Sequence, residues 1–318
     1  MLHQLIHQSF RRPRANKMRA IAFCSAVVFS CLWLVAPEAL TADKPVERHL
    51  ANIRQLTVGG KNAEAYFSFD GTKLIFQSAF DPLTHTSRSC YQIFTMNIDG
   101  SNVRRASTGL GTTTCGVFFP GGRRLLFSST HLHSPYCPPA PPHSHRYRWP
   151  LDEYDIFSAR IDGQDLQRLT SIPEYDAEAT VAPHGKTIVF TSMRNGDLDL
   201  YTMGLDGRNV TQLTREVGYD GGAFFSPDSK RIVYRAYHPR TPEAIQAYRA
   251  LLADRFVEPS HLEIFVMNAD GSDKRQITDN GAANFAPFFT PTGTVSSFHR
   301  TSGPSRLVKE SDQRFISI

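Results

Sequence analysis

The hydrophobic and polar positions from 178 to 214 alternate as short strands separated by turns. The segment reads EATVAPHGKTIVFTSMRNGDLDLYTMGLDGRNVTQLT. An apolar run ends in the turn at 183–185, alternating strands cover 186–191 and 198–203, and a last short strand ends at Thr214. Runs of β-branched and aromatic residues between Pro, Gly and Asp-Gly turns are typical of an antiparallel meander. Four strands in about 44 residues predict one blade of a β-propeller.

The same unit recurs along the chain with fixed spacing. Asp-Gly turns occur at 99–100, 162–163, 206–207 and 270–271, and the next first-hairpin turn lies 21 positions after each Asp. An aromatic residue lies 7 positions after each hairpin-turn position, in the pairs Phe69–Phe76, Pro120–Phe127, Pro183–Phe190, Pro227–Tyr234 and Pro291–Phe298. Only the loop between the second and third strands varies in length. Insertions confined to one equivalent loop are what a propeller requires.

This repeat predicts an all-β protein, a β-propeller of four-stranded antiparallel blades over residues 43–298. Four blades are complete, at 64–107, 115–170, 178–214 and 222–278, and a fifth begins near 285 and loses the pattern after Gly293. Residues Ile53 to Thr57 match the ends of the outer strands, so we expect them to complete the last blade and close the ring. An intact relative would have six blades. Residues 299–318 are predicted to be a non-repeat tail, either a polar tail or the result of a frameshift or truncation.

Two segments carry a family resemblance. Residues 224–234 (FFSPDSKRIVY) and 264–272 (IFVMNADGS) resemble the WD40-like repeat of TolB-type propellers, and the resemblance covers roughly residues 53–298. It implies a propeller with protein partners at one face, as in the periplasmic Tol translocation system. Only residues 43–52 separate the predicted signal from the first strand, so we expect a truncated member without that family's N-terminal α/β domain.

The N-terminal residues predict an export signal. An apolar run from 20 to 36 follows the basic residues Arg11, Arg12, Arg14, Lys17 and Arg19. This order is that of a secretory signal peptide. We expect translation to start at Met18, cleavage after Ala42, and a periplasmic or secreted product, with 1–42 as extension and signal. The alternative is an uncleaved anchor, which would be the chain's contact with a membrane.

The charge of the folded part is nearly balanced. The chain has 35 Lys and Arg against 30 Asp and Glu. Residues 1–42 hold five of these bases and one of the acids, which leaves 30 bases against 29 acids. Charge therefore gives no reason to propose a nucleic-acid partner.

Three cysteines remain outside the predicted signal: Cys90, Cys115 and Cys137. An odd number in an oxidising compartment leaves at least one of them unpaired or bound to another molecule. A Cys90–Cys137 bond and a Cys115–Cys137 bond are both compatible with the sequence.

Candidate ligand residues follow from aligning the blades on their hairpin turns. The position seven before the turn holds Asn62, Thr113, Asp176, Asp220 and Asn284, and the position five before holds Glu64, Cys115, Glu178, Gly222 and Ala286. These are the entries to the innermost strands, which surround one mouth of the central channel in a propeller. Their carboxylates and amides could bind a cation or the charged end of a peptide. Alternatively, the Asn and Asp side chains only cap tight turns.

Two insertions are distinctive. The one in blade 2, residues 130–154, is rich in potential zinc or copper ligands, although their spacing fits no closed structural site and a solvated loop is the alternative. These ligands are His131, His133, Cys137, His143 and His145. The insertion in blade 4 predicts a helix with Thr241 as N-cap and Pro242 at its first position, lying against the propeller rim. Its apolar face would contain Ile245, Tyr248, Leu251 and Leu252.

Catalytic motifs are not evident. The sequence contains no Gly-x-Ser-x-Gly, His-Glu-x-x-His or phosphate-loop pattern. No catalytic residue is assigned, and a divalent cation is the one cofactor left open. The leading hypothesis is an exported scaffold that binds a protein or peptide partner. The alternatives are a hydrolase or lyase, with or without a metal, that uses Glu64, Asp176, Glu178 and Asp220, and a truncated product without independent function.

Overall fold

The computed structural model describes residues 51–139, 146–290 and, for the backbone, 296–301. The predicted signal, the Met18 start and the tail beyond 301 lie outside these residues. The described part is built of β-strands with one helix, α1 (Pro242–Ala253). Within the same residues, α1 included, no helix has the length and apolar character needed to cross a membrane.

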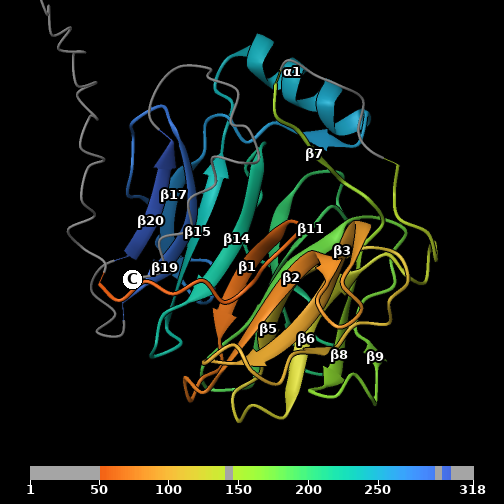
Figure 1. The fold of residues 1–318 in the computed structure, drawn as a ribbon. Coiled ribbons are helices and arrows are strands. Elements are labelled where there is room, and N and C mark those ends of the chain that lie inside the picture. The colour runs from red at the N-terminus through yellow and green to blue at the C-terminus, as the bar shows by residue number, and fades with distance from the viewer. Residues whose placement is uncertain (1–50, 140–145, 291–295, 302–318) are drawn as a thin grey trace, which may run out of the picture. The chain divides into compact units, whose positions relative to one another are not determined.

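Four sheets of four antiparallel strands follow one another along the chain (Figure 1). Blade 1 contains β1 (Asn62–Phe67), β2 (Lys73–Asp81), β3 (Thr86–Asn97) and β4 (Arg104–Arg105). Blade 2 contains β5 (Thr113–Phe118), β6 (Arg124–Ser129), β8 (Asp155–Arg160) and β9 (Gln167–Arg168). Blade 3 contains β10 (Asp176–Val181), β11 (Thr187–Ser192), β12 (Asp199–Gly204) and β13 (Thr211–Gln212). Blade 4 contains β14 (Tyr219–Phe225), β15 (Arg231–Tyr237), β17 (Glu263–Asn268) and β18 (Arg275–Gln276).

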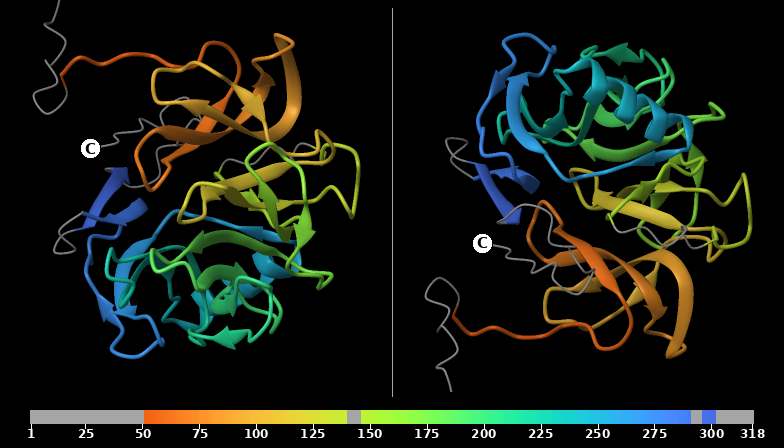
Figure 2. Two further views of the ribbon diagram at one scale, coloured as in Figure 1. Left: turned by 90° about the horizontal axis from the view of Figure 1, so that it is seen from below. Right: turned by 90° about the horizontal axis from the view of Figure 1, so that it is seen from above.

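These sheets confirm the predicted blades, and Figure 2 shows them succeeding one another around a common centre. A fifth blade contributes the hairpin β19 (Ala283–Phe289) and β20 (Ser296–Thr301) to the described part of the chain. Strand β20 continues to Thr301, past residue 298 where the repeat pattern placed the end of the propeller.

The fixed aromatic spacing has a structural cause. In blades 1 to 4 the recurring aromatic residue of the second strand lies directly opposite an aromatic residue of the third strand, and the ring centroids are 5.5 to 6.2 Å apart. The four pairs are Phe76–Phe94, Phe127–Phe157, Phe190–Tyr201 and Tyr234–Phe265. Such cross-strand pairs stabilise a sheet and fill the space between neighbouring blades. In β11, Phe190 packs towards blade 2 while Val189 packs towards blade 4.

Each outer strand of blades 1 to 4 is followed by a Ser or Thr with a structural role. A hydroxyl at each ending accepts a hydrogen bond from a backbone N–H of the third strand. The four bonds are Ile93 to Ser107 (3.0 Å), Ile156 to Thr170 (2.9 Å), Leu200 to Thr214 (2.9 Å) and Ile264 to Thr278 (2.8 Å). The side chain thus satisfies a donor at the point where the short outer strand stops pairing.

The N-terminal segment does not behave as predicted. Residues 53–57 form no strand, so the expected closure of the last blade by this segment is wrong. Leu56 packs instead against the blade 1 cluster that contains Phe76 and Met96, while Ile53 is 72% exposed. An outer strand needs the free edge of a third strand, and blade 5 offers only β19 and β20 within the described residues.

The two insertions form one layer at the end of the blades where the innermost strands begin (Figure 1). Helix α1 starts as predicted, because the Thr241 hydroxyl accepts a hydrogen bond from the Ala244 N–H at 3.2 Å. Its buried residues Tyr248 and Leu252 pack against residues of blades 2, 3 and 4. The blade 2 insertion pairs with the blade 4 insertion through β7 (Trp149–Pro150) and β16 (Phe256–Val257).

Candidate functional site

A bulge interrupts the first strand of every blade at the position five before the hairpin turn. The backbone φ there is 48° at Glu64, 54° at Cys115, 55° at Glu178, 59° at Gly222 and 48° at Ala286. The pairing register shifts at the same points. A left-handed conformation at a non-glycine residue costs about 1 kcal/mol or more. The fold therefore carries strain at four equivalent positions, and a bulge re-aims the side chain that it contains.

The bulge residues of neighbouring blades contact one another. Cys115 and Glu64 of the preceding blade are close enough to shift each other's pKa. The Gly222 N–H donates to Glu178 Oε2 of the preceding blade at 3.1 Å. The Cys115 N–H donates to Gln77 Oε1 of blade 1 at 3.1 Å. The charges of Glu178 and Arg235 also act on the pKa of Glu64, so of the predicted candidates Glu64 and Glu178 belong to one polar cluster.

Arg235 of β15 is the cation of this cluster. Its guanidinium forms an ion pair with Glu178, and its Nε donates to the Tyr219 hydroxyl at 3.0 Å. Glu178 also accepts from the hydroxyls of Tyr219 (2.8 Å) and Thr191 (2.9 Å). The side chains of Arg235 and Glu178 are only 13% and 10% exposed. Buried charges of this kind persist when they are paired and hydrogen-bonded.

Arg235 and Tyr219 are not among the residues predicted from the sequence. Arg235 lies eight positions after the hairpin turn, where blades 1 to 3 have Gln77, Ser128 and Thr191. A recurring polar residue in an otherwise apolar second strand is the signal that could have found it. Tyr219 precedes the aligned positions and carries no comparable signal.

Burial shifts the acid–base properties of the cluster. Burial raises the pKa of Glu64 above its ordinary value, and the Arg235 guanidinium acts in the opposite direction. Burial and the carboxylates of Glu64 and Glu178 raise the pKa of the Cys115 thiol well above its ordinary value. That thiol stays protonated at neutral pH and is a poor nucleophile. The cluster can hold a charged or hydrogen-bonding group, but Cys115 is not activated for covalent chemistry.

The residues seven before the turn do not join the cluster. Asp176 pairs with Arg194 at 3.2 Å, and Asp220 contacts His238 Nε2 at 3.0 Å, each within its own blade. The Asn284 amide donates to the Leu262 carbonyl at 2.6 Å. Asn62 donates to the carbonyl of the nearby Gly59 at 2.8 Å. Of the four carboxylates in the hydrolase or lyase hypothesis, the structure brings together Glu64 and Glu178 only.

The physical reason is the bulge itself. Positions seven and five before the turn would share one face of a regular strand, because side chains alternate with a period of two. The extra residue breaks this alternation. Asp176 and Asp220 are fully buried inside the sheets, and burial raises the pKa of each.

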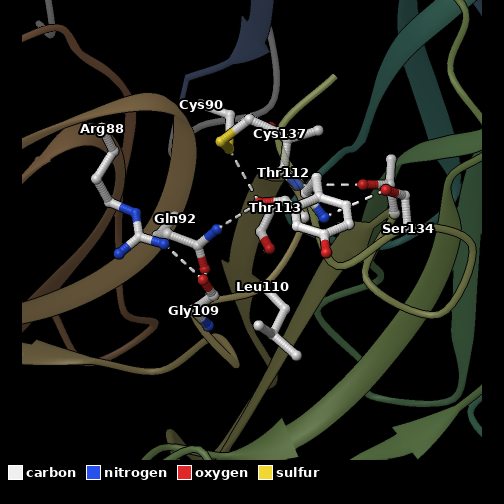
Figure 3. The surroundings of a disulfide bond; sticks show 12 residues. Arg88, Cys90, Gln92, Gly109, Leu110, Thr112, Thr113, Ser134 and Cys137 are labelled. Carbon is white, nitrogen blue, oxygen red and sulfur yellow. Dashed lines mark hydrogen bonds between the residues drawn. A yellow bond between two sulfur atoms is a disulfide. The ribbon is translucent and has the colours of Figure 1, made fainter. Parts of the chain in front are cut away.

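Cys90 and Cys137 form a disulfide with their Cα atoms 5.5 Å apart (Figure 3). This is one of the two pairings that the sequence left open, and it leaves Cys115 as the free cysteine of the described residues. The Gln92 amide donates to the Gly111 carbonyl at 2.8 Å beside the bond. The disulfide ties the blade 2 insertion to β3 of blade 1.

The predicted metal ligands are occupied or lie apart. Cys137 is in the disulfide and so cannot act as a thiolate ligand. His131 Nδ1 lies 2.8 Å from Ser129 Oγ, and His133 contacts Asp155 at 2.8 Å and Glu153 at 3.1 Å. His143 and His145 lie outside the described residues. Among the described residues, no three His, Cys, Asp or Glu side chains are grouped so that they could hold a metal ion.

Aromatic rings border the polar cluster along the inner strands. Trp149 of the blade 2 insertion lies 5.0 Å from the Arg235 guanidinium, measured to the ring centroid. Tyr219 and Phe285 rings lie 5.8 and 5.9 Å from the same group. Further along the inner strands, Tyr66 of blade 1 contacts Phe224 of blade 4, with centroids 5.5 Å apart. The blade 2 insertion therefore places the ring of Trp149 against the polar cluster.

Solved structures share this architecture. A protein from Agrobacterium tumefaciens that is assigned as TolB matches with a TM-score of 0.57 at 18% identity, over 74% of this chain and 73% of that one. TolB from Acinetobacter baumannii matches with a TM-score of 0.52 at 16% identity, over 74% of this chain and 47% of that one. No family model and no curated protein sequence matches the chain. At these identities the likeness concerns the fold, which is that of a TolB-like β-propeller. The chain spans about half of the Acinetobacter protein's length.

Proposed function

We propose that this protein is an exported TolB-like propeller scaffold that binds a protein or peptide partner at the face that carries the insertions. The observation that carries the proposal is that Glu64 and Glu178, each at a strained bulge, are grouped with Arg235 of β15. Strained backbone and buried charges reduce stability, and both are concentrated at functional sites in proteins.

The chemistry of the cluster suits a peptide. Carboxylates and a guanidinium stand beside the rings of Trp149, Tyr219 and Phe285. A peptide segment offers backbone donors and acceptors, charged ends and apolar side chains that match such a surface. The resemblance to the propeller of the Tol translocation system likewise implies protein partners.

Export to the periplasm or the cell surface is part of the proposal. It rests on the basic cluster and the apolar run from 20 to 36. Intact-mass measurement and N-terminal sequencing of the protein from an exporting bacterial host test it. We expect a mature chain that begins after Ala42 in the periplasmic fraction. A full-length chain that stays in the cytoplasm would contradict export.

The binding face can be tested with peptides selected from a random display library against the full chain. Peptides that bind the centre of this face should lose at least tenfold in affinity towards the Glu64→Gln and Glu178→Gln variants. Asp206→Asn is the matched control, because the exposed Asp206 turn lies at the opposite end of the strands. Peptides that bind all three variants as tightly as the unmodified protein would refute this face as the binding site.

A further inference from the structure

Trp149 belongs to blade 2 by sequence but lies among residues of blades 4 and 5. Its ring is 6.1 Å from Tyr219, 5.9 Å from Phe285 and 5.0 Å from the Arg235 guanidinium, centroid to centroid or centroid to carbon. The insertion that carries it reaches across to the α1 side of blade 4, as the position of β7 in Figure 1 shows. The blade 2 insertion therefore positions Trp149 beside residues of blades 4 and 5.

The place that Trp149 occupies is built by other residues. Glu178 and the Tyr219 hydroxyl hold the Arg235 guanidinium from blades 3 and 4, through the ion pair and the 3.0 Å hydrogen bond. The Cζ atom of the guanidinium lies over the ring of Trp149, 5.0 Å from its centroid. A desolvated guanidinium face bordered by rings favours an aromatic side chain through cation–π and edge-to-face contacts. The recess is thus preorganised for an aromatic group.

The segment that carries Trp149 is held by contacts with the blade 4 insertion. Its ladder with β16 comprises two residue pairs, Trp149 with Val257 and Pro150 with Phe256. Pro150 has no N–H to donate. The base of the insertion is secured separately, by the disulfide of Cys137 to blade 1. The Leu151 N–H also donates to the Arg255 carbonyl at 2.8 Å, and Arg148 pairs with Glu258 at 2.8 Å. Displacing Trp149 therefore loosens this ladder and its two flanking contacts, all between the insertions, and leaves the sheets of the blades intact.

We propose that Trp149 is an internal ligand in a recess that accepts an aromatic side chain of the partner, so that partner binding displaces Trp149 from Arg235. This rests on the proposed function and specifies the chemistry of the partner: a segment that inserts a Trp, Tyr or Phe ring. When Trp149 fills the recess, the partner can bind only those molecules in which the recess is free. The apparent affinity is then the intrinsic affinity multiplied by the fraction of such molecules. Removing the indole should therefore strengthen binding.

The first test uses N-acetyl-tryptophanamide as the probe and the full chain. The Trp149→Ala variant should bind the probe at least tenfold more tightly than the unmodified protein in isothermal titration, and N-acetyl-alaninamide should bind neither. Tyr136→Ala is the control, since Tyr136 is a 78% exposed aromatic residue of the same insertion. Equal affinity of Trp149→Ala and the unmodified protein for the probe would overturn the proposal.

The second test needs no variant at the recess. Trp33 and Trp149 are the two tryptophans of the chain, so a Trp33→Phe protein reports on Trp149 by its fluorescence. Excess N-acetyl-phenylalaninamide should shift the emission to longer wavelength and increase quenching by iodide, as the indole enters water. Unchanged emission at a concentration that saturates Trp149→Ala would refute displacement. Neither probe requires a protein partner, so a failed peptide selection would count against the proposed function without affecting these outcomes.

Discussion

Replacing Arg235 with Met tests the central cluster most directly. The substitution keeps an unbranched side chain but removes the guanidinium, which leaves the Glu178 carboxylate 10% exposed without its cation. Removing one partner of a buried ion pair costs about 3–5 kcal/mol. Glu178 would keep three donors, the Tyr219 and Thr191 hydroxyls and the Gly222 N–H. We therefore expect a loss near the lower limit, about 3 kcal/mol of unfolding free energy.

The physical cause can be separated from simple loss of packing by a double-mutant cycle. Glu178→Gln removes the charge that Arg235→Met leaves uncompensated, so the double variant should be more stable than the sum of the single losses predicts, by about 1–3 kcal/mol. Urea unfolding at neutral pH, followed by circular dichroism, measures all four proteins. Arg208→Met is the control, because Arg208 is 83% exposed and should change stability by less than about 0.5 kcal/mol. Additive losses, or a loss below about 1 kcal/mol for Arg235→Met, would refute the argument from a buried charge.

Three further outcomes follow from the geometry. Replacing Cys90 and Cys137 together by Ser should lower the free energy of unfolding, measured in urea, by roughly 4 kcal/mol. The reason is the entropy that the unfolded chain gains when a loop with a sequence separation of 47 is opened. A loss below about 1 kcal/mol would contradict this. Burial raises the pKa of Asp199 from 3.8 to about 6, so protonation of this carboxyl favours the folded state. The unmodified protein should therefore lose stability relative to Asp199→Asn as pH rises from 4 through 6. A stability difference that does not change with pH in urea titrations would argue against this. Gly207→Ala places a Cβ 2.3 Å from the Leu169 carbonyl oxygen, while the Cβ of Gly196→Ala meets nothing within 4 Å. The two glycines have similar φ values of 79° and 82°, so Gly207→Ala should lower the thermal unfolding midpoint clearly more than Gly196→Ala. Equal midpoints would show that the contact with Leu169 relaxes freely.

Half of the candidate site could be predicted from the register of the repeat. Alignment on the hairpin turns identified Glu64 and Glu178, because equivalent positions of a propeller face the same axis. The same alignment placed Asp176 and Asp220 beside them, and there it was wrong. The bulge at the second of these positions breaks the side-chain alternation, and nothing in a single sequence marks a left-handed residue that is Glu, Cys or Ala rather than Gly.

The sequence by itself determined the blades, their turns and helix α1, because turn chemistry, strand alternation and capping act between residues close in the chain. Only the tertiary structure decided that Cys137 bonds to Cys90, that Leu56 packs on blade 1 instead of closing a blade, and that Trp149 meets Arg235. Each of these contacts involves a segment outside the repeat, either an insertion of variable length or the residues before the first blade. The packing of the sheets brings these segments together, and no local sequence pattern encodes how close they come.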